Sequence, residues 1–182
     1  MKELSLNILD IAENSVKAGA TLTRILIDET ESSLTITISD DGCGMTKDIC
    51  ERVCDPFYTT RTTRSVGLGI PLFKLEAEQT GGDFYIQSRD KAANPETHGT
   101  EVTARFNKDH IDFTPLGDVV ATVVTLIQGH PETDFYFCHK KGQQSATLDT
   151  RELREVLGEV SLAEYEVIKW IEEFLKEQYI NL

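Results

Sequence analysis

The chain has 182 residues, a formal net charge of −13 and a pI near 4.7. This acidic balance, with no basic stripe, argues against nucleic acid or an anionic membrane as a partner. No apolar run approaches the ~18 residues of a membrane span and no apolar segment marks a signal peptide, so we expect a cytoplasmic protein with one domain and an appendage.

The first predicted element is a helix over residues 4–18. Apolar side chains recur on one side of it, while Asp10, Asn14 and Lys17 follow at i, i+4 and i+7 on the other, with Glu13 on the same flank. A carboxylate, a carboxamide and an ammonium group therefore project together. Oxygen ligands of this kind hold Mg²⁺ through one or two protein contacts. The alternative is the solvated polar face of an ordinary surface helix.

Two strands are predicted next, over residues 22–28 and 34–39, as an antiparallel hairpin packed on the first helix. The second strand alternates apolar and polar residues, and continuing this alternation puts Asp40 on the apolar side. A carboxylate there is costly unless it accepts hydrogen bonds, and the exocyclic amine of adenine would be such a donor. Gly42 and Gly44 would let the backbone approach a flat ring. A plain Asp-Gly turn is the alternative.

A short helix capped by Thr46 is predicted to end at residue 54, before a polar segment over residues 55–69. This segment has no apolar periodicity and is rich in hydroxyl groups. Its two cations are Arg61 and Arg64. The composition predicts a mobile lid.

Gly67, Leu68 and Gly69 open the next predicted helix. Glycines that lead into a helix N-terminus present N–H donors and the positive end of the helix dipole, which suit a phosphate. The GxxxxGK[ST] phosphate loop is absent from the sequence. Two further strands, over residues 83–89 and 100–106, complete an α+β pattern. It predicts an antiparallel-leaning sheet with helices on one face.

The segment after residue 108 is predicted to be a small α/β extension. Its expected elements are a helix over residues 116–128, strands over 134–139 and 144–149, a helix through 158 capped by Asp149 or Thr150, and a last helix reaching about residue 179. Ser161 and Glu164 form a capping-box signature for that last helix. The apolar stripe along it predicts packing on its own domain, with a dimer seam as the alternative.

Three of the cysteines lie close together in the sequence: Cys43, Cys50 and Cys54. They make no CxxC pair. A metal or redox cluster is conceivable, but we expect reduced thiols that act as small apolar side chains.

Four segments, taken in order, resemble the sequence boxes of the GHKL superfamily, the ATP-binding domains of gyrase, heat-shock chaperones, histidine kinases and MutL. They are residues 8–20 (N box), 40–45 (G1 box), 55–60 (F box) and 67–69 (G2 box), followed by the glycine–threonine element at 99–100. The resemblance covers residues 3–107. It implies a two-layer α/β sandwich over residues 1–108 that holds ATP and Mg²⁺, with residues 109–182 as a partner-docking or dimerisation extension.

The resemblance also implies the roles of single residues. Asn14 would bind Mg²⁺ and Asp40 would receive the adenine amine. In a kinase, Arg61 or Arg64 would stabilise charge as the lid closes. Lys17 and Gly67 to Gly69 would hold the phosphates. The other nucleotide-binding residues that it implies are Gly42, Gly44, Met45, Phe57, Leu68 and Thr100.

Details of the boxes divide between kinases and ATPases. Lys17 and Phe57 match histidine kinases, whereas Asp10 stands where the ATP-hydrolysing branches carry the glutamate that orients water. We expect no helical hairpin before the domain, and we expect no transducer domain like that of gyrase or MutL, for which the tail of about seventy-five residues is too short. A solitary domain of this size is similar to the trans-acting kinases and anti-sigma factors of the superfamily.

We therefore expect an ATP-binding regulatory protein of signal transduction that transfers a phosphoryl group from Mg²⁺-ATP to a histidine or serine of a partner protein. An ATP-hydrolysing switch with Asp10 as the base is one alternative, and a nucleotide sensor without catalysis is another. A homodimer fits the same sequence. The chain's own histidines are acceptors only in principle, and we expect surface positions for all of them: His98, His110, His130 and His139.

Overall fold

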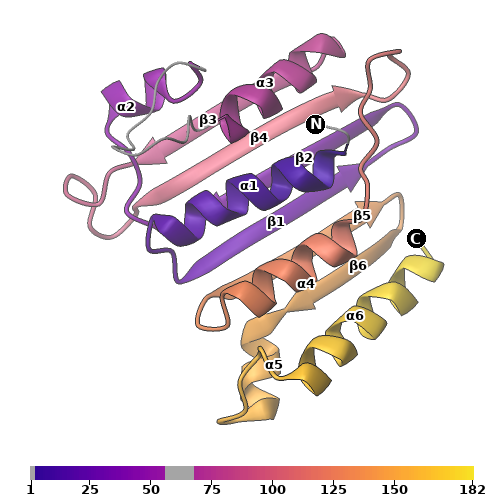
Figure 1. Ribbon diagram of the computed structural model, residues 1–182. Coiled ribbons are helices and arrows are strands. Elements are labelled where there is room, and N and C mark those ends of the chain that lie inside the picture. Colours follow the sequence, from indigo (N-terminus) through magenta and orange to yellow (C-terminus); the bar gives the residue numbers. More distant parts are fainter. Residues whose placement is uncertain (1–2, 56–67) are drawn as a thin grey trace.

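The computed structural model describes residues 3–55 and 68–182, which form one six-stranded sheet and its helices (Figure 1). The strands are β1 Leu22–Glu29, β2 Ser33–Asp40, β3 Asp83–Arg89, β4 Gly99–Asn107, β5 Asp134–Lys141 and β6 Gln144–Asp149. The helices are α1 Leu4–Lys17, α2 Lys47–Arg52, α3 Gly69–Gln79, α4 Val119–Gly129, α5 Thr150–Leu157 and α6 Tyr165–Ile180. Each predicted strand is thereby confirmed.

The strand order is β3-β4-β2-β1-β5-β6. Every neighbouring pair is antiparallel except β1 and β5, which are parallel, so the predicted antiparallel-leaning sheet is confirmed. The β5–β6 hairpin of the extension adds to the edge of the sheet that the first 108 residues begin (Figure 1). The use of the extension for docking or dimerisation stays a prediction.

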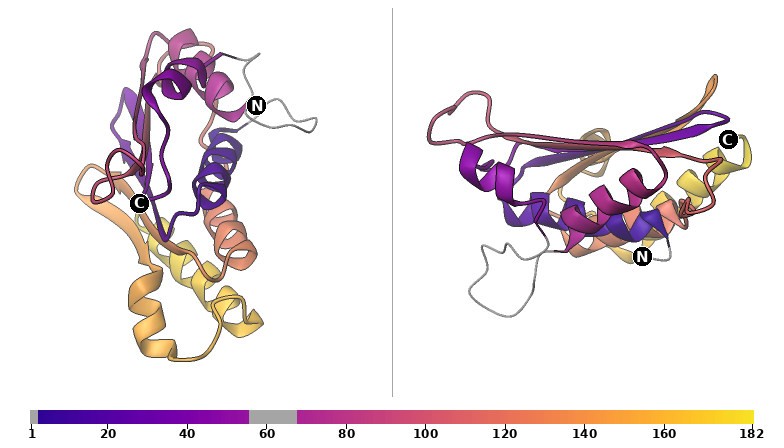
Figure 2. Two further views of the ribbon diagram at one scale, coloured as in Figure 1. Left: turned by 90° about the vertical axis from the view of Figure 1, so that its left-hand side faces the viewer. Right: turned by 90° about the horizontal axis from the view of Figure 1, so that it is seen from above.

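Helices α1, α3 and α4 lie together on one face of the sheet, which gives the two layers of the predicted sandwich (Figure 2). The alternation predicted over residues 34–39 decides which side of β2 meets them. Its apolar residues Leu34, Ile36 and Ile38 are at most 1% exposed, and Phe106 from β4 is fully buried beside them in the core. Each such side chain contributes about 1.5–3 kcal/mol to the stability by leaving water.

Three helices begin directly after a residue whose short polar side chain accepts a hydrogen bond from a backbone N–H group of the first turn. Thr46 caps α2 through the N–H of Ile49, as predicted. Asp149, one of the two predicted candidates, caps α5 through the N–H of Arg151. Asp118 caps α4 in the same way, so that helix begins at Val119, three residues later than predicted.

The predicted capping box of the last helix is wrong. The hydroxyl of Ser161 accepts from the N–H of Ala163, within a turn, and α6 begins only at Tyr165. The turn places Leu162 in the core with no exposed surface, which accounts for the delayed start. The helix N-cap is Glu164, and its side chain makes no capping hydrogen bond.

The apolar stripe of α6 packs on its own chain, as predicted. Ile168, Ile171 and Leu175 are at most 9% exposed, and α6 contacts α4 and β6. Trp170 stacks on Phe174 with ring centroids 4.8 Å apart and keeps 47% of its surface exposed. In residues 3–55 and 68–182, no helix combines the length and apolar character needed to cross a bilayer.

Candidate functional site

The polar flank of α1 carries the first group of predicted site residues. Asp10 and Lys17 are exposed and Asn14 is partly buried, so all three side chains reach the surface. The Lys17 ammonium group lies 3.6 Å from the carboxylate of Glu13, one turn earlier on the helix. The predicted grouping of carboxylate, carboxamide and ammonium on one flank is therefore present.

The N-terminus of α3 meets this flank at Asp10. A Cβ built at Gly69, the first residue of α3, would lie 3.2 Å from the Cβ of Asp10 and 3.8 Å from its Oδ2. The N-cap residue Leu68 makes no side-chain hydrogen bond to the first turn of α3. The first-turn N–H groups and the positive end of the helix dipole therefore lie beside the flank, a place suited to phosphate.

Asp40 ends β2 with its carboxylate held by backbone donors. Its Oδ1 accepts from the N–H of Gly42 at 2.9 Å and from the N–H of Thr100 at 3.3 Å. The strand register sets Asp40 opposite Thr100. The hydrogen-bond donors predicted for this carboxylate are thus present. Within the described ranges no group donates to Oδ2. That oxygen can still accept a hydrogen bond from a ligand.

Asp41 has a different task from its neighbour. Its Oδ1 accepts from the backbone N–H groups of Thr21 and Leu22, at 2.7 and 2.9 Å, and its Oδ2 accepts from the Thr21 hydroxyl. Burial alone would raise the pKa of Asp41, but these hydrogen bonds outweigh it and hold the pKa below its ordinary value. Asp41 therefore fastens the loop after β2 to the start of β1.

Two residues that sequence reasoning missed hold the same loop from the other side. The Nδ1 of His98 lies 2.6 Å from the carbonyl oxygen of Gly42, and because a carbonyl only accepts, that nitrogen carries the proton and donates. The hydroxyl of Ser88 accepts from the N–H of Met45 at 2.7 Å and pairs with the hydroxyl of Thr100 at 2.8 Å. Their only signal in the sequence is their nearness to the strands that flank the glycine–threonine element.

The backbone conformation and close packing at position 44 require glycine. Its φ is +66°, and a Cβ there would lie 1.9 Å from the carbonyl oxygen of Arg89. Gly42 is tightly enclosed as well, because a Cβ would lie 2.9 Å from that of Ala18. Both glycines thus let the loop pack on its neighbours, and their predicted approach to a flat ring stays a prediction.

Several predicted site residues lie outside the described part of the chain: Phe57, Arg61, Arg64 and Gly67, together with the rest of the predicted lid over residues 56–67. Their roles stay predictions.

The cysteines near the loop show no sign of a metal centre. Burial raises the pKa of the Cys50 and Cys54 thiols, which disfavours the thiolate that binds metals. Over residues 3–55 and 68–182, no three His, Cys, Asp or Glu side chains lie close enough to share a metal ion.

The donors on α1 fit a Mg²⁺-nucleotide better than a metal held by protein alone. Asn14 and Asp10 offer hard oxygen ligands one turn apart, and magnesium bound this way takes its other ligands from phosphates and water. Gly69 lets the start of α3 approach Asp10 closely, since a Cβ there would press on the Asp10 side chain. Asp40, with Oδ2 unused, lies at the end of β2 and suits an exocyclic amine.

Residues 2–110 match the model of a protein family described as histidine kinase-, DNA gyrase B-, and HSP90-like ATPase. Sporulation kinase E of Bacillus subtilis (strain 168) is 29% identical over 90 residues, which are 50% of this chain and 12% of that protein. The tetrathionate sensor histidine kinase TtrS of Salmonella typhimurium is 30% identical over 99 residues, 54% of this chain and 16% of that one. The chain thus spans less than a fifth of the length of these relatives.

Solved structures show the same fold. The MutL ATPase domain of Aquifex aeolicus, solved with ADP, has a TM-score of 0.55 at 16% identity and covers 86% of this chain and 69% of its own. The N-terminal domain of a DNA repair protein also has a TM-score of 0.55, at 14% identity, and covers 82% of this chain and 53% of its own. The sequence boxes, the two-layer sandwich and the family match agree, and the chain belongs to the histidine kinase-, DNA gyrase B- and HSP90-like ATPases.

Proposed function

We propose that the chain binds Mg²⁺-ATP and transfers its γ-phosphoryl group to a histidine or serine side chain of a partner protein. The observation that carries the proposal is the convergence of three elements. Asp40 at the end of β2 keeps Oδ2 free for an amine, α1 presents Asn14 on its polar flank, and the N-terminus of α3 meets that flank at Gly69. An adenine amine, a magnesium ion and phosphates suit these three places in turn.

Each residue of the site has one task in this proposal. Asp40 accepts the adenine amine, with Met45 and Thr100 alongside, and Asn14 gives its carboxamide oxygen to the metal. Bound Mg²⁺ would offset negative charge on the phosphates. Lys17 and the first turn of α3 hold the phosphates, and Arg61 or Arg64 stabilises charge on the transferred group.

Nucleotide binding is tested first, by calorimetric titration of Mg²⁺-ADP into wild type and Asp40→Asn. The variant replaces one acceptor oxygen with an NH₂ group that faces the adenine amine, so we expect an affinity loss of tenfold or more. Asp28→Asn is the matched control, because Asp28 is an exposed carboxylate near the end of β1, whereas Asp40 lies opposite the start of that strand. Equal affinities in all three proteins would contradict the adenine assignment.

Transfer to a partner is tested with ATP labelled at the γ position. Wild type would label a protein captured with it, and mass spectrometry would locate the modified residue. Asn14→Ala should lose the label, because it lacks the carboxamide oxygen that holds the metal. Bound ATP that stays intact, with no labelled protein, would count against transfer and favour a nucleotide sensor.

A hydrolytic switch is the second candidate, and the position of Asp10 favours it. The Asp10 carboxylate lies beside Gly69, at the helix N-terminus proposed to hold the phosphates. It is therefore close to the position of a water that would attack the γ-phosphate. Phosphate release by wild type that is lost in Asp10→Asn, with nucleotide affinity kept, would establish hydrolysis. Release that is unchanged in the variant would remove Asp10 from the mechanism.

A further inference from the structure

Glu13 stands beside the proposed metal ligand Asn14 and has two partners on opposite sides. Its Oε1 lies 2.7 Å from the Nε2 of His130, and its Oε2 lies 3.6 Å from the Nζ of Lys17. The histidine contact is short and partly buried, with side chains 26% and 29% exposed. The lysine contact is longer, and the Lys17 side chain is 57% exposed. The histidine is therefore the fixed partner of Glu13, and the lysine is the loosely held one.

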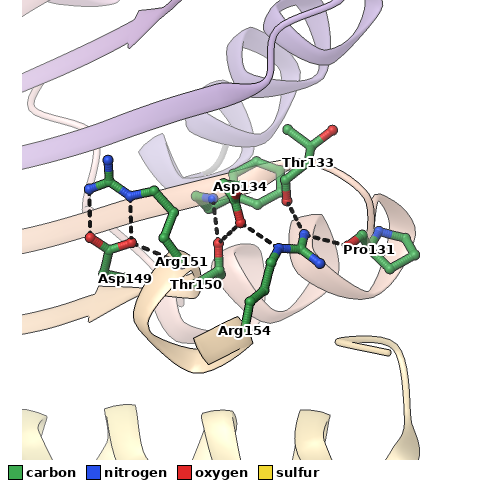
Figure 3. Close-up of polar contacts among 8 residues, drawn as sticks. Pro131, Thr133, Asp134, Asp149, Thr150, Arg151 and Arg154 are labelled. Atoms are coloured by element: carbon green, nitrogen blue, oxygen red, sulfur yellow. Dashed lines mark hydrogen bonds and ion pairs between the residues drawn. The ribbon is translucent and has the colours of Figure 1, made fainter. Parts of the chain in front are cut away.

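His130 comes from the extension, beyond the residues that match the family. It is the C-cap of α4, which lies alongside α1 in the helical layer (Figure 1). The loop that carries it is itself fastened. Arg154 of α5 donates to the carbonyl of Pro131 at 2.6 Å and to the carboxylate of Asp134 at 2.7 Å (Figure 3). A line of contacts therefore runs from α5 through this loop to the polar flank of α1.

We propose that His130 and Glu13 control how readily the Lys17 side chain leaves Glu13 to meet the nucleotide phosphates. The extension would thereby tune nucleotide affinity. The inference rests on the proposed function, since Lys17 is a phosphate ligand only there. By donating to Oε1, His130 draws part of the carboxylate's charge toward α4 and weakens its hold on Lys17. Without that donor, Glu13 has Lys17 as its remaining partner among the described residues, and the lysine is held back.

The test measures the affinity of the Mg²⁺ complex of a non-hydrolysable ATP analogue by calorimetry. His130→Ala should weaken binding about twofold to fivefold, the size of an exposed charge interaction. His130→Gln, which keeps a donor at a similar reach, should bind close to wild type. Glu13→Gln should tighten binding by a similar factor because Lys17 is released. His110→Ala is the matched control, since that partly exposed histidine has Asp112 as the polar partner of its ring among the described residues.

Combined variants separate this mechanism from a purely structural effect. In the Glu13→Gln background, His130→Ala should change nothing, because the carboxylate through which it acts is gone. In a Lys17→Met background, Glu13→Gln should also lose its effect. A His130→Ala loss that persists without Glu13 would overturn the proposal. A Glu13→Gln gain that persists without Lys17 would overturn it too, since Glu13 would then repel the phosphates directly.

Failure of the inference can be told from failure of the proposed function. Wild type that binds the analogue, with His130→Ala and Glu13→Gln both at wild-type affinity, would overturn the inference alone. Wild type that does not bind at all would overturn the proposed function and the inference with it. Thermal unfolding of each variant verifies that the affinities refer to folded protein.

Discussion

Asp40 and Asp41 are neighbours with the same side chain, and the end of β2 gives them separate roles. The strand register turns Asp40 toward Thr100, while Asp41 turns toward the start of β1 and receives donors from Thr21 and Leu22. Among the described residues no group donates to Oδ2 of Asp40, whereas both carboxylate oxygens of Asp41 accept hydrogen bonds from Thr21 and Leu22. The proposed recognition of adenine therefore rests on Asp40 and not on Asp41.

His98 should act on Asp40 through the backbone of Gly42, whose carbonyl it binds and whose N–H binds Asp40. His98→Ala removes the donor, and we expect the ratio of ADP to GDP affinity to fall about threefold to tenfold, since one hydrogen bond is worth about 0.5–1.5 kcal/mol. His98→Asn places an amide N–H near the position of Nδ1 and should restore the ratio. His98→Gln, whose amide lies one carbon further out, should restore it less. An unchanged ratio in His98→Ala would remove the histidine from recognition.

The buried side chain of Asn7 should lower the stability of the helical layer. Its side chain has no exposed surface, and among the described residues neither its Oδ1 nor its Nδ2 has a hydrogen-bond partner. A buried amide without partners costs about 1–3 kcal/mol, so Asn7→Leu, which keeps the number and branching of the side-chain heavy atoms, should raise the free energy of unfolding by up to about that amount in urea titrations. A lowered free energy with Asn7→Leu and with the smaller Asn7→Ala would mean that the amide has a partner in solution.

Arg154 joins α5 to the segment of residues 131–134 through three hydrogen bonds and should matter more than its neighbour on the same helix. It binds Pro131, Thr133 and Asp134, whereas among the described residues the Arg151 side chain pairs with Asp149 alone (Figure 3). Arg154→Ala leaves a partly buried carboxylate with fewer donors, and we expect a loss of about 1–3 kcal/mol in the free energy of unfolding.

The same substitution reports on the line of contacts to α1. Arg154→Ala should weaken nucleotide binding as His130→Ala does, and the two together should weaken it no further. Arg151→Ala is the matched control and should change neither property. Additive losses of affinity would show that Arg154 acts by a different route.

Elements of the fold follow from local patterns, and their arrangement does not. The helical period of apolar residues in α1 and their alternation in β2 involve residues that are close in the sequence. Both elements, and the group Asp10, Asn14 and Lys17, could therefore be predicted. The contacts of His98 with Gly42 and of His130 with Glu13 join residues 56 and 117 positions apart. A single sequence gives no measure of such distances, and the same holds for the pairing of β5 with β1.

His139 shows the same limit at the scale of the whole molecule. A surface position was predicted for it and is wrong, because the histidine is 2% exposed. It lies in β5 between the two halves of the chain, with Nε2 3.1 Å from Glu29 of β1 and Nδ1 2.8 Å from the Tyr179 hydroxyl of α6. Lys108, just after β4, donates to Glu29 at 2.7 Å. Neutral histidine satisfies this network, donating from Nε2 and accepting from tyrosine at Nδ1.

Stability should therefore fall as the pH drops through the range in which unfolded histidine binds a proton. Burial lowers the pKa of His139 below its ordinary value of 6.5, more than Glu29 raises it, so the unfolded chain takes up the proton first. The loss begins near pH 6.5, at no more than about 1.4 kcal/mol per pH unit for one proton. Urea unfolding between pH 7.5 and 5.5 should show a shallower slope for His139→Gln than for wild type, with His110→Gln as control. Equal slopes in all three would mean that His139 is protonated in the fold and that this network tolerates its charge.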